Sequence, residues 1–313
     1  MRASRLSRPA GLMLSLAALG CLPALPAPPA DALPGARPPA TAAYGTGSAG
    51  SVRSLALQGA VNVRDLGGYR TAGGGRVRYG QVFRADALSR LTDADVVELS
   101  RLGLRTVVDF RVPEEVRGDG ADRLPAGLAV TSRPVHDLGL YTTTTEVIAS
   151  EDPVAQRRTL GGGRAERLMR SVYRSFVTDP DDRRRFAETL RDIADRRETP
   201  LLLHCTSGKD RTGWLSYVLL RAGGVPAATA ERDYLLSNGF RAAADRRTRE
   251  QLGESGLMRD PDLLIPLQEV RAGYLEAALD QAGRDYGGLH GYLTRGLGLD
   301  NRTLAALRAR LVG

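Results

Sequence analysis

An apolar run, a short polar loop and a second apolar run follow one another between Pro200 and Ala222, in "PLLLHCTSGKDRTGWLSYVLLRA". The first run suits a buried strand, and the second has the length and apolar content of a buried helix. A strand that passes through a tight, glycine-containing loop into a helix is a building unit of α/β proteins. We therefore expect this loop at the carboxyl end of a parallel strand, the edge at which such proteins bind ligands.

The remainder of the chain repeats this alternation. Strands are predicted around 81–84, 104–111 and 128–135, and helices at 93–103, 165–177, 179–197 and 226–238, with two or three more helices at the end. A short strand and then a polar turn are expected within 55–69, and the Thr- and Gly-rich residues 139–163 are expected to be loop. The predicted fold is α/β, with a mostly parallel central sheet flanked by helices and a helical C-terminal third.

The first 32 residues have the pattern of a secretory signal peptide. Three arginines precede an apolar stretch from Gly11 to Leu22, and small residues follow it. The stretch is too short to span a bilayer, and no later stretch is long and apolar enough. The sequence around Cys21 matches a lipoprotein signal poorly, so secretion is favoured over lipid anchoring.

Residues 33–53 are rich in Pro, Ala, Gly, Ser and Thr and are predicted to be a disordered linker, which leaves 54–313 as one folded domain. Beyond the predicted signal peptide the chain contains a single cysteine, Cys205, so it can form no internal disulfide. A lone thiol in an exported protein is better explained by reactivity than by structure.

The net charge of +8 favours anionic ligands. Nucleic acid is not the expected partner, because the arginines are scattered along helices and aromatic residues make up only 5% of the chain. The 44 basic residues include one lysine, Lys209, which lies in the loop after the predicted strand. Every other basic residue is an arginine, so the choice of lysine at this position indicates a specific role for its ammonium group.

The loop "HCTSGKDRTG" has the parts of a phosphate-binding cradle with a nucleophile at its base. Backbone N–H groups of Thr206, Ser207 and Gly208 and the start of the following helix favour an anion. We expect the Cys205 thiol to lose its proton easily there. Arg211 can bind two phosphoryl oxygens.

Other loop residues complete this chemistry. Lys209 adds charge to the cradle, and the Thr212 hydroxyl is expected to donate a hydrogen bond to the cysteine sulfur. These parts suit phosphoryl transfer to sulfur and hydrolysis of the resulting cysteinyl phosphate, without cofactor or metal. The three histidines, His136, His204 and His290, do not have the spacing of metal ligands.

The loop differs from two other arrangements. It is not a nucleotide-binding P-loop, because Asp210 follows Lys209 and the first glycine of that motif is missing. An inert buried cysteine after an apolar strand is common, but the complete "HCxxGKxRTG" pattern between a strand and a helix is much more specific.

The pattern resembles the signature loop of cysteine-dependent protein tyrosine phosphatases, and residues 54–312 resemble the exported bacterial tyrosine/phosphoinositide phosphatases. "NVRDLGGYRTAGGGRVRYGQVFRADAL", "VVDFRVPEEV" and "DYLLSN" are similar to further segments of that family. The resemblance implies a catalytic domain over 54–313 with Cys205 as nucleophile and Arg211 as phosphate binder. It also implies that Lys209 and Asp210 mark acceptance of phosphoinositides, and that 240–268 form a mobile lid.

The role of general acid falls to Asp210 or Asp109. Asp210 is favoured because it immediately precedes the binding arginine. Asp109 ends a predicted strand and could be the acid, could orient Arg211, or could form a structural ion pair with Arg84 or Arg111.

Further polar residues near the predicted site are given more ordinary roles. Asp65 is expected in a turn, His204 is expected to orient the loop backbone through its ring, and His136 and Asp137 are expected to be exposed. Trp214 is expected in the core, and Arg84 resembles a position close to the phosphate in the family.

The predicted function is hydrolysis of phosphotyrosine in proteins, with phosphoinositides and phosphoserine or phosphothreonine as further substrates. The alternatives are a pseudophosphatase that binds phosphorylated partners without turnover and a sulfur-transfer enzyme with a persulfide loop. The intact Cys205, Asp210 and Arg211 argue against the first, and Asp210 with the "RTG" helix start argues against the second.

Overall fold

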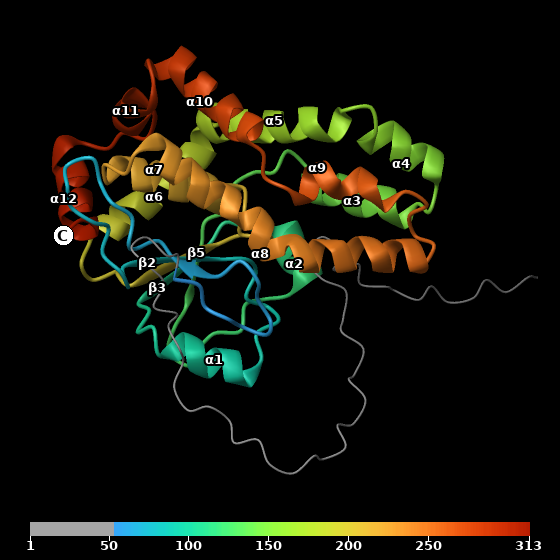
Figure 1. The fold of residues 1–313 in the computed structure, drawn as a ribbon, viewed down its shortest axis with the longest axis horizontal. Coiled ribbons are helices and arrows are strands. Elements are labelled where there is room, and N and C mark those ends of the chain that lie inside the picture. The colour runs from blue at the N-terminus through green and yellow to red at the C-terminus, as the bar shows by residue number, and fades with distance from the viewer. Residues whose placement is uncertain (1–52) are drawn as a thin grey trace, which may run out of the picture.

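The computed structural model describes residues 53–313, and its centre is a five-stranded sheet in the order β1-β2-β5-β3-β4 (Figure 1). The strands are β1 (Arg64–Asp65), β2 (Val82–Ala85), β3 (Thr106–Asp109), β4 (Val130–Ser132) and β5 (Leu201–His204). Only β1 is antiparallel to its neighbour, so the predicted, mostly parallel sheet is confirmed. All residues of β2, β3 and β5 are buried, as their apolar sequences require.

The helices surround this sheet. They are α1 (Asp93–Ser100), α2 (Pro113–Asp119), α3 (Leu140–Ala149), α4 (Pro153–Leu160), α5 (Arg164–Thr178), α6 (Pro180–Ala194), α7 (Arg211–Ala222), α8 (Ala227–Glu254), α9 (Ile265–Gln268), α10 (Ala272–Tyr286), α11 (Leu289–Gly291) and α12 (Asn301–Leu311). A 3₁₀ turn at Pro261–Leu264 precedes α9, and a π-helical turn at Tyr292–Gly296 follows α11. The predicted helical C-terminal third is therefore confirmed.

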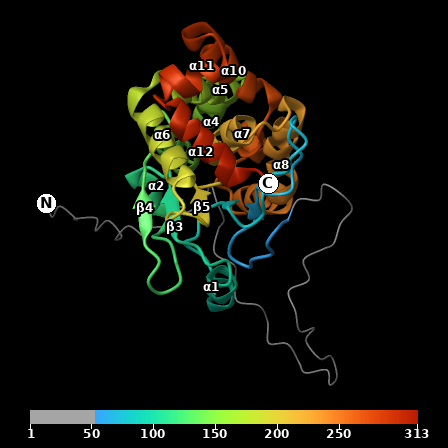
Figure 2. The same cartoon turned by 90° about the vertical axis from the view of Figure 1, so that its left-hand side faces the viewer.

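The two faces of the sheet carry unequal layers, as Figure 2 shows. Phe83, Val107 and Leu202 project toward α1 and form a small core with Leu99. Alternate residues of the same strands project to the other face, because successive side chains of a strand point in opposite directions. There they enter a large core formed mainly by α5, α6, α7, α8 and α10.

The predicted helix starts are confirmed at two places. Thr92 accepts a hydrogen bond from the Asp95 backbone N–H and caps α1, and Asp179 caps α6 with Pro180 in the first turn. The short strand predicted within 55–69 is β1, which comprises Arg64–Asp65, and Ser54 adds an isolated bridge to Arg64. Asp65 accepts from the Gly67 and Gly80 backbone N–H groups, a turn role as expected.

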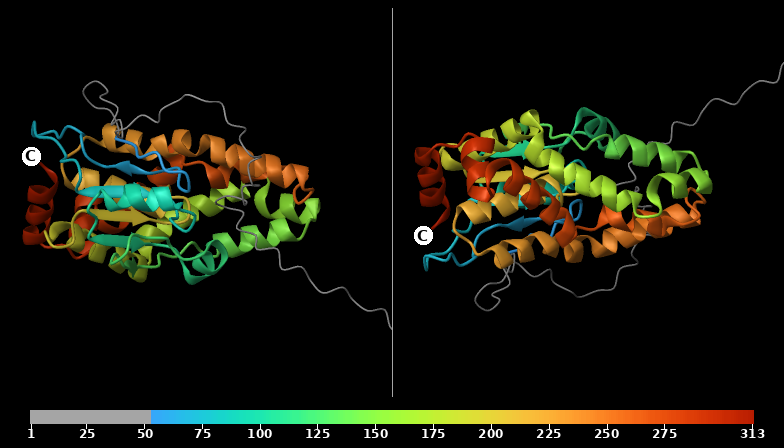
Figure 3. Two further views of the ribbon diagram at one scale, coloured as in Figure 1. Left: turned by 90° about the horizontal axis from the view of Figure 1, so that it is seen from below. Right: turned by 90° about the horizontal axis from the view of Figure 1, so that it is seen from above.

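The prediction of a loop over 139–163 is wrong, because this segment contains all of α3 and α4. Threonine and glycine lower helix propensity, but tertiary burial overrides it here. Val147, Ile148 and Leu160 are buried against the main core, and Asp152 caps α4 with Pro153 behind it. Figure 3 shows these green helices and the orange end of α8 extending beyond one end of the sheet.

The predicted signal peptide, and the predicted linker up to residue 52, lie outside the described residues. Within residues 53–313, no helix has both the length and the apolar character needed to cross a membrane. The C-terminus lies beside the strand-like segment before β2, where Val77 bridges Val312.

Candidate active site

The loop from Cys205 to Arg211 connects β5 to α7 and forms the base of a pocket at the carboxyl edge of the sheet. Every residue of this loop except Gly208 lines the pocket, together with Glu115, Asp137, Leu140, Tyr141 and Leu267. Cys205 is 1% exposed and directly follows β5, so the strand holds its sulfur in place. The structure thus brings together the loop residues that the sequence singled out.

The backbone of this loop presents unpaired donors. Among the described residues, none of the backbone N–H groups of residues 206–211 donates a hydrogen bond. Buried N–H groups are nearly always paired in folded proteins, so consecutive unpaired groups at a helix N-terminus indicate an anion site. This backbone path requires glycine at position 208. The φ of Gly208 is +62°, and a Cβ atom there would lie only 2.2 Å from the Ala85 carbonyl oxygen.

Arg211 is held by a carboxylate that the sequence analysis did not identify. Its guanidinium pairs with both oxygens of Glu115, with 2.6 Å between Nη1 and Oε2, and also donates to the Phe110 carbonyl. Burial acts to lower the pKa of Arg211, but Glu115 more than offsets this and raises it well above its ordinary value. Glu115 is itself 2% exposed and accepts from the Thr206 hydroxyl at 2.6 Å, so it links two loop residues.

Asp210 carries hydrogen bonds on both carboxylate oxygens. The Tyr173 hydroxyl donates to Oδ1 at 2.9 Å, and the Lys209 ammonium donates to Oδ2 at 2.7 Å. Burial and the charge of Asp210 raise the pKa of Tyr173 well above its ordinary value, so its phenol keeps its proton as a donor. Lys209 is 2% exposed, so its charge is held within the pocket wall.

Asp109 does not line the pocket. It pairs with Arg111, accepting from the Arg111 side chain at 2.9 Å and from its backbone N–H at 2.8 Å. The expected alternative of orienting Arg211 does not apply, because Glu115 has that position. Of the roles considered for Asp109, the geometry favours the structural ion pair.

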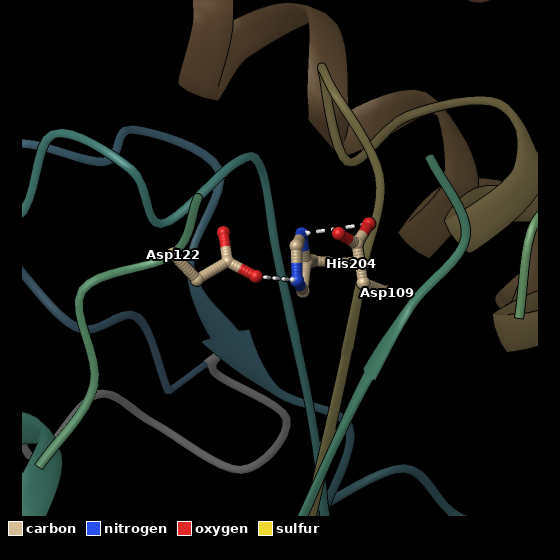
Figure 4. Close-up of side chains that lie close together, drawn as sticks. All are labelled: Asp109, Asp122 and His204. Atoms are coloured by element: carbon tan, nitrogen blue, oxygen red, sulfur yellow. Dashed lines mark ion pairs between the residues drawn. The ribbon is translucent and has the colours of Figure 1, made fainter. Parts of the chain in front are cut away.

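The ring of His204 lies between two carboxylates, as Figure 4 shows. Its Nε2 is 2.9 Å from Asp122 Oδ2, and its Nδ1 is 3.8 Å from Asp109 Oδ1. The prediction that this ring orients the loop backbone is therefore wrong. Burial acts to lower the pKa of His204, but Asp109 and Asp122 outweigh it and raise the pKa above its ordinary value.

Two groups of His and Asp side chains are close enough together to be considered for a metal ion. In the first, Asp109, Asp122 and His204, both carboxylates already pair with Arg111, so a cation is present in the network. In the second, His136, Asp179 and Asp182, the nearest Asp179 oxygen accepts the N–H groups that begin α6. In each group, carboxylate oxygens are therefore already engaged by donors of the protein.

The remaining predictions have mixed outcomes. Trp214 is fully buried, as expected. His136 is exposed, but Asp137 is buried and lines the pocket, where its carboxylate accepts from the N–H groups of Gly139 and Tyr141. Thr212 is buried, and among the described residues its hydroxyl has no hydrogen-bond partner, so the expected bond to sulfur is not formed.

The pocket therefore combines a cysteine sulfur, unpaired backbone donors and a paired arginine around one small anion site, at the edge of a parallel sheet. This arrangement defines the class of cysteine-dependent phosphatases. A family model described as "Tyrosine phosphatase family" matches residues 55–313. The chain belongs to this family, and it is a protein-tyrosine phosphatase.

Curated relatives support the same assignment. The triple specificity protein phosphatase PtpB of Mycobacterium tuberculosis is 32% identical over 82% of this chain and 98% of its own length. A putative tyrosine-protein phosphatase of Cupriavidus necator is 34% identical over 79% of this chain and 85% of its own. The crystal structure of P. aeruginosa TpbA with phosphotyrosine covers 76% of this chain and 99% of its own at 17% identity, with a TM-score of 0.26, too low to carry structural detail.

Proposed function

We propose that this phosphatase hydrolyses phosphotyrosine through a cysteinyl-phosphate intermediate on Cys205. The observation that carries the proposal is the run of unpaired N–H groups from Thr206 to Arg211 around that sulfur. These donors and the Arg211 guanidinium bind the nonbridging phosphoryl oxygens. The positive end of α7 adds to this stabilisation.

The first chemical step forms a sulfur–phosphorus bond. The thiolate of Cys205 attacks phosphorus in line with the tyrosyl oxygen, the phosphorus–oxygen bond breaks, and the leaving oxygen takes a proton. Asp210 supplies that proton, because its carboxyl group lines the pocket beside the loop. When the phosphate enters, it competes for the Lys209 ammonium and frees Asp210 Oδ2 to carry the proton.

The second step releases phosphate. A water molecule attacks the cysteinyl phosphate, its proton passes to the Asp210 carboxylate, and the sulfur leaves as a thiolate. The Tyr173 hydroxyl, 2.9 Å from Asp210 Oδ1, orients the carboxylate in this step. Each turnover therefore restores the Cys205 thiolate and the protonated carboxyl group of Asp210.

Further substrates are proposed on chemical grounds. PtpB, a relative across nearly its whole length, is described as having triple specificity. Phosphoinositides and phosphoserine or phosphothreonine carry the same phosphoryl group on alkyl oxygens, so the same cradle would bind them. Export of the protein, suggested by residues 1–32, is proposed together with these substrates.

The mechanism is tested by trapping the intermediate. Rapid quenching during turnover of a ³²P-labelled phosphotyrosine peptide should leave label on Cys205 in the wild type and none in Cys205→Ser. The Cys205→Ser variant should bind inorganic phosphate while its turnover is abolished. Residual activity within tenfold of the wild type, or loss of activity on adding a chelator, would contradict the proposal.

A further inference from the structure

Two carbonyl groups of the Cys205–Arg211 loop point away from the anion site onto buried donors. Asn62 Nδ2 lies 3.2 Å from the Ser207 oxygen and 3.1 Å from the Gly208 oxygen. Arg84 Nη2 lies 2.7 Å from the same Gly208 oxygen. Both donor residues are fully buried, so these bonds are shielded from water.

One carboxylate on α8 connects the two donors. Asp233 accepts from Arg84 Nη1 at 2.9 Å and from Arg64 Nε at 3.0 Å. Arg64 Nη1 in turn donates to Asn62 Oδ1 at 2.5 Å. Asp233 therefore reaches the Gly208 carbonyl by two routes, through Arg84 alone and through Arg64 with Asn62.

The direction of a carbonyl decides the direction of the next N–H group. In a trans peptide unit the C=O and N–H bonds point in opposite directions. When the Ser207 and Gly208 carbonyls face Asn62 and Arg84, the N–H groups of Gly208 and Lys209 face the other way, toward the anion site. A flipped peptide would instead present an oxygen to the phosphate and repel it.

The charges of Arg64, Arg84 and Asp233 also favour an anion at this site. Arg64 and Arg84 share the single carboxylate of Asp233, so the group carries an excess positive charge. Burial and the neighbouring Arg64 lower the pKa of Arg84 to about 10, which still leaves it charged at neutral pH. Arg84, the cation of this network that contacts the loop, therefore favours an anion bound there.

We propose that Asn62 and Asp233, with Arg64 and Arg84, are positioning residues that hold the loop in its anion-binding orientation. The inference deepens the proposed function and rests on it in one respect, that this loop binds the phosphoryl group. It assigns a function to the "NVRD" segment, Asn62 to Asp65, and to the "DYLLSN" segment, which begins at Asp233. Neither segment lines the pocket, so both act through the loop.

The experiment compares two variants of Asn62 with a matched control. Asn62→Ala removes the donor, and Asn62→Asp keeps the shape but places a carboxylate against two carbonyl oxygens. Tyr69→Phe is the control, because the Tyr69 hydroxyl donates to Asp233 at 2.9 Å but contacts no loop residue. Each protein is assayed for phosphotyrosine-peptide turnover, melting temperature, and protection of Cys205 from iodoacetamide by inorganic phosphate.

The expected result separates positioning from stability. Asn62→Ala should weaken phosphate protection by about tenfold, the scale of one lost hydrogen bond, and Asn62→Asp should weaken it further. Tyr69→Phe should change phosphate affinity by less than about twofold, whatever its effect on melting temperature. The kcat of both Asn62 variants should fall with folded protein remaining, because the same N–H groups stabilise the transition state.

Two results would overturn the inference. One is a folded Asn62→Ala protein with wild-type phosphate protection and kcat. The other is an equal loss of phosphate affinity in Asn62→Ala and Tyr69→Phe, which would make the network generally structural. Failure of the proposed function would look different, because the wild type itself would then show neither turnover nor protection by phosphate.

Discussion

Glu115 binds both terminal nitrogens of Arg211 and thereby fixes the plane of the guanidinium that faces the anion site. The geometry is bidentate and almost fully buried, so the pair is well ordered and poorly screened by water. In the free protein Arg211 is therefore already oriented for phosphate, and binding need not restrict it further.

Replacing Glu115 by glutamine should lower kcat/KM for a phosphotyrosine peptide by roughly tenfold to a hundredfold, because Arg211 loses a charged, two-point partner. The loss should also appear as weaker binding of inorganic phosphate. Glu114→Gln is the matched control, since Glu114 is exposed and, within residues 53–313, its ion-pair partner is Arg117 alone. Equal kinetics of the two variants would show that Glu115 does not orient Arg211.

Lys209→Met should reduce turnover of phosphoinositides more than turnover of phosphotyrosine. The Lys209 ammonium is the one pocket cation whose described partner is Asp210 alone, and a headgroup with several phosphates gains most from it. Initial rates on a phosphoinositide panel and on one phosphotyrosine peptide, at the same ionic strength, measure the ratio. A uniform loss on all substrates would mean that Lys209 serves the transferred phosphoryl group in general.

The buried pair of His204 and Asp122 should make stability depend on pH. The pKa of His204 is raised above its ordinary value of 6.5 by Asp109 and Asp122, despite burial. A raised pKa means that the folded state binds the proton more tightly than the unfolded state. The stabilisation of the folded state by protonated His204 is therefore complete below pH 6.5, and it is lost as the pH rises through the raised pKa.

Asp122→Asn removes the closest partner of the His204 ring and should flatten this dependence. The difference in melting temperature between the wild type and the variant, measured from about pH 5.5 to about pH 9, should narrow as pH rises, and the part due to the lost Arg111 pair should remain. A constant difference between the two proteins across that range would show that the His204 proton does not contribute.

The fold class and the loop could be predicted because their signals are local. Three leucines followed by His204, and an apolar helix that begins at Arg211, specify a strand, a loop and a helix within one segment. The partners of the loop could not be predicted in this way. Glu115 is 96 positions from Arg211, and several carboxylates were equally available to it in the sequence.

The helices α3 and α4 also could not be predicted from local sequence. "LYTTTTEVIA" is a weak helix former by composition, and its helix depends on burial of Val147 and Ile148 and on Asp137, which accepts the N–H group of Tyr141. The same hydrogen bond holds Asp137 at the start of α3, where it lines the pocket, so the unpredicted helix also hid a pocket residue. The lid expected over 240–268 contains the second half of α8 and all of α9, and its mobility stays a prediction.

The identity of the general acid gives the sharpest kinetic prediction. Asp210 lines the pocket, whereas Asp109 is paired with Arg111 away from it. The need for an acid grows with the basicity of the leaving oxygen, and acid catalysis contributes about a hundredfold to ten-thousandfold. Asp210→Asn should therefore cost little on an aryl phosphate with a very acidic phenol and much more on phosphotyrosine or an alkyl phosphate.

A neighbouring variant tests the same assignment. Tyr173→Phe removes one hydrogen bond from Asp210 and keeps the carboxyl group, so it should show a smaller effect with the same order of leaving groups. If Asp210→Asn slows every leaving group equally and Asp109→Asn shows the graded dependence, Asp109 is the acid and Asp210 only shapes the loop.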